Sequence, residues 1–587
     1  MRSETRWLPI VCLLACGLNL RAASTTIWQI GNFDKSSREF ARDVSPTRGG
    51  ALDYSNPDDD PVYVIGKSQP GKNWLAFQPG TSNGRAGHRG HPFTIRFSLS
   101  SPPRGVYTFT AALLAYSPRV PVLNISINGS HGWFYQHPTL DYDAGDLGSV
   151  FAPRYSAATI AFDFPASYLK LGDNKLVLTA TDQPDARDDS EGAPMVVGNS
   201  GIYYDALKLE QNPTGRIPPA QVTANVTPTI FYKSKDGKQA EVIEVDIRLS
   251  ELPKRGSVTL LLGNQKFTAP FANGHDFGEQ RFDFEVPEFS SESPADVKVE
   301  WNGHLRDFPQ KLVPGKKWNI FMVPHEHLDI GFSDYQGKVA EVQSRTIEEA
   351  MAIARREPDF RFSIDGYWSA EQFLANCSEP GRREFLELVR QGRIIVPPQY
   401  ASLLTGLPTV ETLIRSLYGG YRFNREHGGS ISYANISDVP SQTGSYPSIL
   451  AAAGLKYFLH ASNGYRGPFI MLGGLNEKSP WYWEGADGKR ILTWSALGYY
   501  QSRIMFGIPP KLPALYGSLP IFLQSYTRPG YKSDGVIVFG TQWENTDLNP
   551  DQLGDIPEWN KLYAYPKIHI SGVGEAMDYG MYTTIYG

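Results

Sequence analysis

The chain has few cysteines, no large excess of either charge and no long apolar run beyond its N-terminus. Of its 587 residues, three are cysteines, and Cys12 and Cys16 both lie within the first 23 residues. Only Cys377 remains, which leaves the mature chain without an internal disulfide, so its stability must come from ordinary cores. A net charge of -5 gives no reason to expect nucleic-acid binding. No second apolar stretch approaches the length of a transmembrane helix.

Residues 1–23 are typical of an export signal. Two arginines precede an apolar run over residues 8–20 that is too short to span a bilayer comfortably. The run contains Leu-Leu-Ala-Cys-Gly, which also fits a bacterial lipoprotein cleavage box in which Cys16 would carry a lipid anchor. Ordinary cleavage near Ala22 or Ala23 is the alternative. We therefore expect an exported protein that is periplasmic, extracellular or lipid-anchored at the cell surface.

The N-terminal half alternates apolar and polar residues in short segments separated by Gly, Pro, Asn and Asp. The first six segments are 94–99, 106–116, 122–127, 159–164, 175–179 and 202–209. They predict an antiparallel β-sandwich over residues 24–212. A linker with three prolines follows at 212–219. Alternation then resumes and predicts a second, smaller, immunoglobulin-like sandwich over residues 220–314.

From residue 316 onwards, apolar strands alternate with segments of helical period. The expected order is a strand at 318–323, a helix around 339–354, a strand at 360–364, a helix around 385–389 and a strand at 394–396. This order predicts a parallel sheet with helices outside, and its length favours a closed (β/α)7-type barrel over residues 316–587. The predicted fold class is multidomain α+β, with two antiparallel β-sandwiches followed by this barrel.

Histidines and an aspartate follow the first strand of the predicted barrel. Residues 324–329 read Pro-His-Glu-His-Leu-Asp. Alternate residues leaving a strand point the same way, so His327 and Asp329 can direct a ring nitrogen and a carboxylate oxygen at one divalent cation. The alternative is a solvated turn with one buried histidine. The pattern at a strand end is uncommon, and we predict a metal site.

Two further acidic segments follow apolar strands. One ends at Asp438, and the other is Gly-Thr-Gln-Trp-Glu-Asn-Thr-Asp, which contains Glu544 and Asp547. Each alone is more typical of an acidic residue that caps the next helix. Because the carboxyl ends of barrel strands meet at one mouth, three such segments together favour a catalytic site.

These residues resemble a known family. Residues 323–332, Val-Pro-His-Glu-His-Leu-Asp-Ile-Gly-Phe, are similar to the signature of glycoside hydrolase family 38, the α-mannosidases. The segment Asp-Val-Pro-Ser-Gln-Thr that starts at Asp438 resembles the nucleophile segment of that family. The resemblance implies one Zn²⁺ per chain, held by His327, Asp329 and Asp438, with His325 supporting the ligands. It also implies that Asp438 is the nucleophile.

The implied activity is retaining, metal-dependent hydrolysis of an α-mannosidic or related bond in a plant or microbial polysaccharide or glycan. Glu544 and Asp547 are both candidates for the acid/base. Phe332, where the family signature has a tryptophan, and Trp543 are the expected sugar contacts.

The family completes its zinc site with a histidine beyond the barrel, and this sequence stops at Gly587. We therefore expect either a substitute ligand or a fragment. Two other classes stay open: a non-catalytic glycan-binding protein with an incomplete barrel, and a metal-dependent carbohydrate deacetylase or amidohydrolase.

The first predicted sandwich has a resemblance of its own. Thr-Ile-Trp-Gln-Ile-Gly at 26–31 and Tyr-Val-Ile-Gly-Lys-Ser at 63–68 are similar to the C-terminal carbohydrate-binding-like module of rhamnogalacturonan lyases, polysaccharide lyase family 4. Trp28, Trp74 and Trp133 are candidate platforms for stacking on sugar rings, although a core position is the more common role of a tryptophan.

Overall fold

A computed structural model gives the arrangement of most of the chain. It describes residues 24–116, 122–136, 158–181, 200–217, 221–235, 237–249, 255–271, 275–439, 441–462, 479–496, 498–542 and 544–585. The predicted export signal, with Cys16, and the predicted sugar contact Trp543 lie outside these residues.

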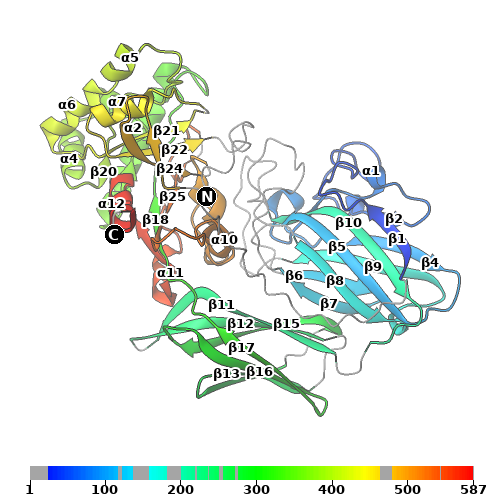
Figure 1. Cartoon of the computed structure of the whole chain (residues 1–587). Coiled ribbons are helices and arrows are strands. Elements are labelled where there is room, and N and C mark those ends of the chain that lie inside the picture. The colour runs from blue at the N-terminus through cyan, green and yellow to red at the C-terminus, as the bar shows by residue number, and fades with distance from the viewer. Residues whose placement is uncertain are drawn as a thin grey trace, which may run out of the picture.

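Two sheets face each other in the N-terminal region (Figure 1). One has the order β1 (Thr25–Gly31), β10 (Gly201–Asn212), β5 (Val106–Tyr116) and β8 (Ala158–Pro165), with β3 (Phe77–Pro79) also paired to β10. The other begins with β2 (Val62–Val64), β4 (Phe93–Leu99), β9 (Gly172–Thr181), β6 (Val122–Ile127) and β7 (Ser130–Tyr135). The short helix α1 (Pro70–Asn73) lies between β2 and β3 in the chain.

Period-two alternation explains these strands. In β6, Leu123, Ile125 and Ile127 are buried, and the residues between them are partly exposed. Apolar residues of both sheets, such as Ile95 and Phe109, belong to one core. The sequence therefore forms strands because one face of each can be buried against the opposite sheet.

The second region has two more groups of strands. One consists of β11 (Val222–Lys235), β12 (Lys238–Leu249) and β15 (Phe277–Pro287). The other has the order β14 (Gln265–Pro270), β13 (Gly256–Leu262), β16 (Ser293–Trp301) and β17 (His304–Leu312). Ile243, Val245 and Ile247 are fully buried in the core that these strands share.

One sheet of nine strands passes through all three regions. β7 pairs in parallel with β15 of the second region, where Phe277 lies opposite Gly132. At the other end, β11 pairs with β26 (Tyr563–Tyr565) of the C-terminal region, where Tyr232 lies opposite Tyr565. In Figure 1 the second region lies beneath the other two and is joined to each. Backbone hydrogen bonds therefore connect the N-terminal module to the C-terminal region.

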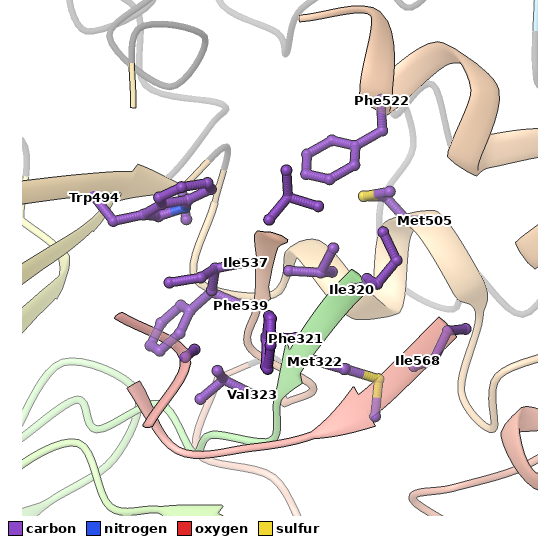
Figure 2. Close-up of a cluster of buried hydrophobic side chains, with 14 of the residues drawn as sticks. Ile320, Phe321, Met322, Val323, Trp494, Met505, Phe522, Ile537, Phe539 and Ile568 are labelled. Atoms are coloured by element: carbon purple, nitrogen blue, oxygen red, sulfur yellow. The ribbon is translucent and has the colours of Figure 1, made fainter. Parts of the chain in front are cut away.

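Parallel strands form the centre of the C-terminal region. β18 (Asn319–Val323) lies between β25 (Gly535–Phe539) and β27 (Lys567–Ile570), and β19 (Phe362–Ser363) pairs with β20 (Ile394–Ile395). β21 (Tyr433–Asp438), β22 (Tyr457–Ser462) and β24 (Arg490–Ala496) are also parallel, with β23 (Trp481–Glu484) antiparallel at the edge. Figure 2 shows side chains of β18, including Ile320 and Met322, packed among those of β25 and β27.

Helices follow most of these strands. They are α2 (Gln336–Arg356), α3 (Tyr367–Asn376), α4 (Glu379–Arg390), α5 (Val410–Arg415), α6 (Tyr418–His427), α7 (Tyr446–Ala452), α9 (Gln501–Phe506), α10 (Leu512–Gln524), α11 (Ile556–Leu562) and α12 (Val573–Ile585). α2 begins and ends close to the predicted bounds because its apolar stripe, from Val339 to Ala354, is buried. None of the helices in the described ranges is long and apolar enough to cross a membrane.

The mixed α+β class, with many sheets and a strand-rich N-terminal region, is confirmed. The closed (β/α)7-type barrel stays a prediction, because the described C-terminal strands form three separate sheets, and an isolated bridge between His325 and Ser363 joins only two of them. The predicted domain boundaries likewise stay predictions.

Candidate active site

The loop after β18 is buried. His325, Glu326 and His327 are each at most 1% exposed, so the alternative of a solvated turn is wrong. The bridge between His325 and Ser363 holds the start of the loop beside β19. The loop can therefore present its side chains inside the protein.

His327 lies between carboxylates on both sides of its ring. Its Nε2 is 3.4 Å from Oδ1 of Asp329 and 3.8 Å from Oδ2 of Asp438. Its Nδ1, on the opposite edge, is 3.6 Å from Oδ2 of Asp365. The ring stacks on Tyr499 with centroids 4.0 Å apart. The two nitrogens of one histidine thus face two different acidic groups.

Asp438 ends β21 in a left-handed backbone conformation, with φ of +60°. It does not cap α7, because Ser445 holds the N-cap position of that helix. Glu544 is also left-handed, with φ of +52°. This conformation is strained for residues other than glycine, and strain of this kind gathers at functional sites. Both residues support the predicted catalytic site.

Glu544 is held against the His327 loop by its neighbour in sequence. The amide of Asn545 accepts a hydrogen bond from the backbone N–H of Asp329 at 3.1 Å and donates one to its carbonyl at 2.7 Å. Gln343 of α2 donates to Oδ1 of Asn545 and to the carbonyl of His327. As a result, donor atoms of His327, Asp329 and Glu544 all lie within 4.8 Å of one another. The hydroxyl of Tyr499 donates to Oε1 of Glu544 at 3.2 Å.

The carboxylates around His327 shift the pKa values of the site. Burial lowers the pKa of His327, but Asp329 and Asp365 outweigh burial and raise it to about 10. Burial raises the pKa of Asp329, but His327 outweighs burial and lowers it. Burial, together with the nearby Asp329, raises the pKa of Glu544. The carboxylates therefore stabilise positive charge at this point, which can be a proton on His327 or a bound cation in its place.

The donor atoms fit a divalent metal. Nε2 of His327 and Oδ2 of Asp329 are buried and have no hydrogen-bond partner among the described residues. Buried polar atoms rarely lack a partner, and such an atom points to an ion or water that completes it. One imidazole nitrogen with carboxylate oxygens is a donor set that Zn²⁺ accepts.

The other predicted site residues lie elsewhere or at the edge. Asp547 has a side chain that is 62% exposed and is ion-paired with Arg345, outside the cluster. Phe332 is 72% exposed after the His327 loop. His325 faces Asp365, with 3.3 Å between Nε2 and Oδ1, as expected of a supporting residue.

Sequence reasoning missed Asp365 and Tyr499. Asp365 follows the predicted strand 360–364 directly, and the rule that reactive groups gather at strand ends could have found it. Tyr499 follows β24 with no motif around it, so no sequence signal marks it.

Two of the three proposed stacking tryptophans need correction. Trp28 is 4% exposed, and Trp74 is fully buried against Phe93 and Tyr204. Neither ring can receive a sugar, because core side chains cover both. Trp133 is partly exposed, with one ring face stacked on His275 at 4.7 Å.

The fold and the cluster define a multidomain protein with a candidate metal centre. Residues 317–579 match the model of the glycosyl hydrolases family 38 N-terminal domain, and residues 26–209 match the CBM-like domain III of polysaccharide lyase family 4. Both predicted resemblances, to glycoside hydrolase family 38 and to polysaccharide lyase family 4, are therefore confirmed over these two parts of the chain.

Individual relatives match only parts of the chain. Rhamnogalacturonate lyase B of Emericella nidulans is 29% identical over 225 residues, which are 32% of this chain and 33% of the lyase. An α-mannosidase structure from Enterococcus faecalis V583 is 17% identical with a TM-score of 0.36, over 45% of this chain and 29% of its own. Another family 38 structure from Enterococcus faecalis is 16% identical with a TM-score of 0.33, over 45% of this chain and 27% of its own. This chain therefore aligns with about a third or less of each relative.

Proposed function

We propose that the protein is an exported, zinc-dependent, retaining glycoside hydrolase of α-mannosidase type. The observation that carries this proposal is the convergence of His327, Asp329, Asp438 and Glu544, with buried donor atoms of the first two lacking partners among the described residues. The family 38 match over the same residues supports glycosidase chemistry.

In this proposal His327, Asp329 and Asp438 hold the metal. When bound, Zn²⁺ supplies Lewis-acid polarisation and a template for sugar hydroxyls. The chain's own residues orient the sugar ring: the buried loop fixes Asp329, and the strained end of β21 aims Asp438 at the same point.

Two carboxyl groups carry the chemistry. The Asp438 carboxylate attacks the anomeric carbon, and the bond from that carbon to the leaving oxygen breaks as Glu544 donates its proton to that oxygen. Glu544, now a carboxylate, then takes a proton from water, and the resulting hydroxide displaces Asp438 from the anomeric carbon. Glu544 is assigned this role because it lies in the cluster, whereas Asp547 is exposed and paired with Arg345. The raised pKa of Glu544 favours the protonated form that the first step needs.

The substrate and location are part of the same proposal. The CBM-like domain and its similarity to a rhamnogalacturonate lyase support a plant or microbial polysaccharide as substrate. The signal-like residues 1–23 support export to the periplasm or beyond, with Cys16 as the candidate site of lipid anchoring.

Trapping the covalent intermediate tests this mechanism. A fluorinated α-mannosyl fluoride, followed by peptide mass spectrometry, should place one sugar on Asp438, and product analysis by NMR should show a retained anomeric configuration. The Asp438→Asn protein is the control and should not be labelled. An inverted product, or a metal-dependent release of acetate in place of sugar, would point to the other hydrolase classes.

A further inference from the structure

Asp365 occupies the centre of the site's hydrogen-bond network. It follows β19, is fully buried, and lies between the loop after β18 and the end of β21. Its contacts come from both neighbours. They are Nε2 of His325, Nδ1 of His327, the backbone N–H of Leu328, Nδ2 of Asn435 and Oγ of Ser437.

The carboxylate is fixed by strong hydrogen bonds. Oδ1 accepts from Asn435 at 2.7 Å, and the Ser437 hydroxyl lies 2.7 Å from Oδ1 and 2.6 Å from Oδ2. The N–H of Leu328 donates to Oδ2 at 3.1 Å. Gln399 adds a hydrogen bond to the Asp365 carbonyl at 3.0 Å. With both oxygens engaged, the side chain has little freedom to turn.

This placement sets the orientation of His327. Nδ1 faces Asp365, and Nε2 faces Asp329 and Asp438. A carboxylate beside Nδ1 favours the form of the ring with its proton on Nδ1, which leaves the lone pair of Nε2 directed at the candidate metal position.

The same carboxylate also holds the strand that ends in Asp438. Asn435 and Ser437 lie two residues apart on β21, so their side chains leave the same face of the strand. Both bind Asp365, and Ser437 is adjacent to Asp438. A shift of Asp365 would therefore move the metal-binding histidine and the proposed nucleophile together.

We propose that Asp365 is the positioning residue that sets the ring orientation of His327 and the end of β21 at once. The inference rests on the proposed function, since it concerns the same metal site. It assigns a role to a residue outside the group of candidate metal ligands.

Metal affinity of the full chain tests this directly. Zn²⁺ binding is measured by competition with a chromophoric chelator, and the Co²⁺-loaded protein gives a visible spectrum that reports ligand geometry. Asp365→Asn should bind Zn²⁺ about 10- to 100-fold more weakly and show an altered Co²⁺ spectrum. Ser437→Ala removes no charge but removes the hydroxyl that contacts both oxygens of Asp365 and lies 3.5 Å from Nδ1 of His327. This variant should show a smaller loss in the same direction.

The matched control is Glu241→Gln, which also removes a fully buried carboxylate but lies where the second region meets Gly315. Its Zn²⁺ affinity should equal that of the wild type. Wild-type affinity and spectrum in Asp365→Asn would overturn the inference. If that variant does not fold, unchanged affinity in Ser437→Ala overturns it instead.

A wild-type protein that binds no metal would contradict the proposed function itself, and this failure would appear before any variant is made.

Discussion

The N-terminal module and the C-terminal region each bury a charged cluster, but the two clusters differ in how completely their atoms are paired. In the module, Asp59 is 1% exposed and accepts hydrogen bonds from Arg48 at 2.6 and 2.7 Å, from the Ser45 hydroxyl and from the N–H of Asp53. In the C-terminal region, Oδ2 of Asp329 and Nε2 of His327 have no such partner among the described residues.

This difference distinguishes a cluster that stabilises the fold from one that is suited to bind a ligand. A buried carboxylate with every oxygen paired stabilises its loop, whereas unpaired buried atoms cost free energy unless a ligand completes them. The strained backbones of Asp438 and Glu544 occur beside the unpaired cluster. Among the described residues of the C-terminal region, the two non-glycine residues with left-handed backbones thus both lie where a ligand is expected.

Asp438→Asn has the largest expected effect. Loss of the proposed nucleophile should lower kcat by about 10⁴-fold or more, measured with nitrophenyl glycosides. Asparagine tolerates the left-handed backbone of this position, so thermal unfolding should stay close to that of the wild type. Asp487→Asn, in an exposed turn before β24, is the control. Hydrolysis by Asp438→Asn at the wild-type rate would remove this residue from the mechanism.

Glu544→Gln should lower kcat by about 10²- to 10⁴-fold for poor leaving groups, because no acid then protonates the leaving oxygen. The loss should shrink with a dinitrophenyl leaving group, and azide should restore turnover. Asp547→Asn, three residues further along the chain and paired with Arg345, should keep near-normal activity. The reverse ranking of these two variants would return the acid/base role to Asp547.

Glu241 is intermediate between the two clusters, because its hydrogen bonds offset the cost of burying its carboxylate only in part. Burial raises its pKa to about 7, despite a hydrogen bond from Gly315. The pKa of Glu241 is higher in the folded protein than in the unfolded chain. This carboxyl group therefore stabilises the fold fully below about pH 4.5, and that stabilisation is lost as the pH rises through about 7. Relative to wild type, Glu241→Gln should therefore gain up to about 3 kcal/mol in unfolding free energy between pH 5 and pH 8. An equal difference at both pH values, in urea unfolding, would contradict this.

Asp59→Ala should have the smallest effect of these variants. Unlike the active-site variants, it should lower stability and leave activity unchanged. Removing the shared acceptor of Arg48, Ser45 and Asp53 should destabilise the module by about 2 kcal/mol. Thermal unfolding measures this loss, and hydrolysis of a small aryl glycoside should be unchanged. A loss of aryl-glycoside hydrolysis without any loss of stability would break the comparison between the two clusters.

Local periodicity was enough to predict many elements. Strand β6 and helix α2 follow from the spacing of their apolar residues, because burial of one face decides both. His327, Asp329 and Asp438 could be selected because each stands at the end of an apolar strand, and the structure brings them together.

Long-range contacts could not be predicted in the same way. Nothing local indicates that β7 pairs with β15 or that Asp365 meets two histidines from another strand. Trp28 and Trp74 look the same in sequence as exposed stacking residues. Only the side chains that pack around them from distant parts of the chain, such as Phe97 beside Trp28 and Phe93 beside Trp74, bury them. The assignment of the acid/base role to Glu544 rather than Asp547 depends on the two hydrogen bonds between Asn545 and Asp329, which join segments 216 residues apart.

The most direct test of a metal-dependent glycosidase is hydrolysis of a panel of nitrophenyl α-glycosides by the purified mature protein, before and after removal of metal by a chelator. The account predicts release of nitrophenol from the α-mannoside, loss of that release with chelator, and recovery with Zn²⁺. Release that the chelator does not affect, or no release from any sugar by the metal-loaded protein, would contradict it.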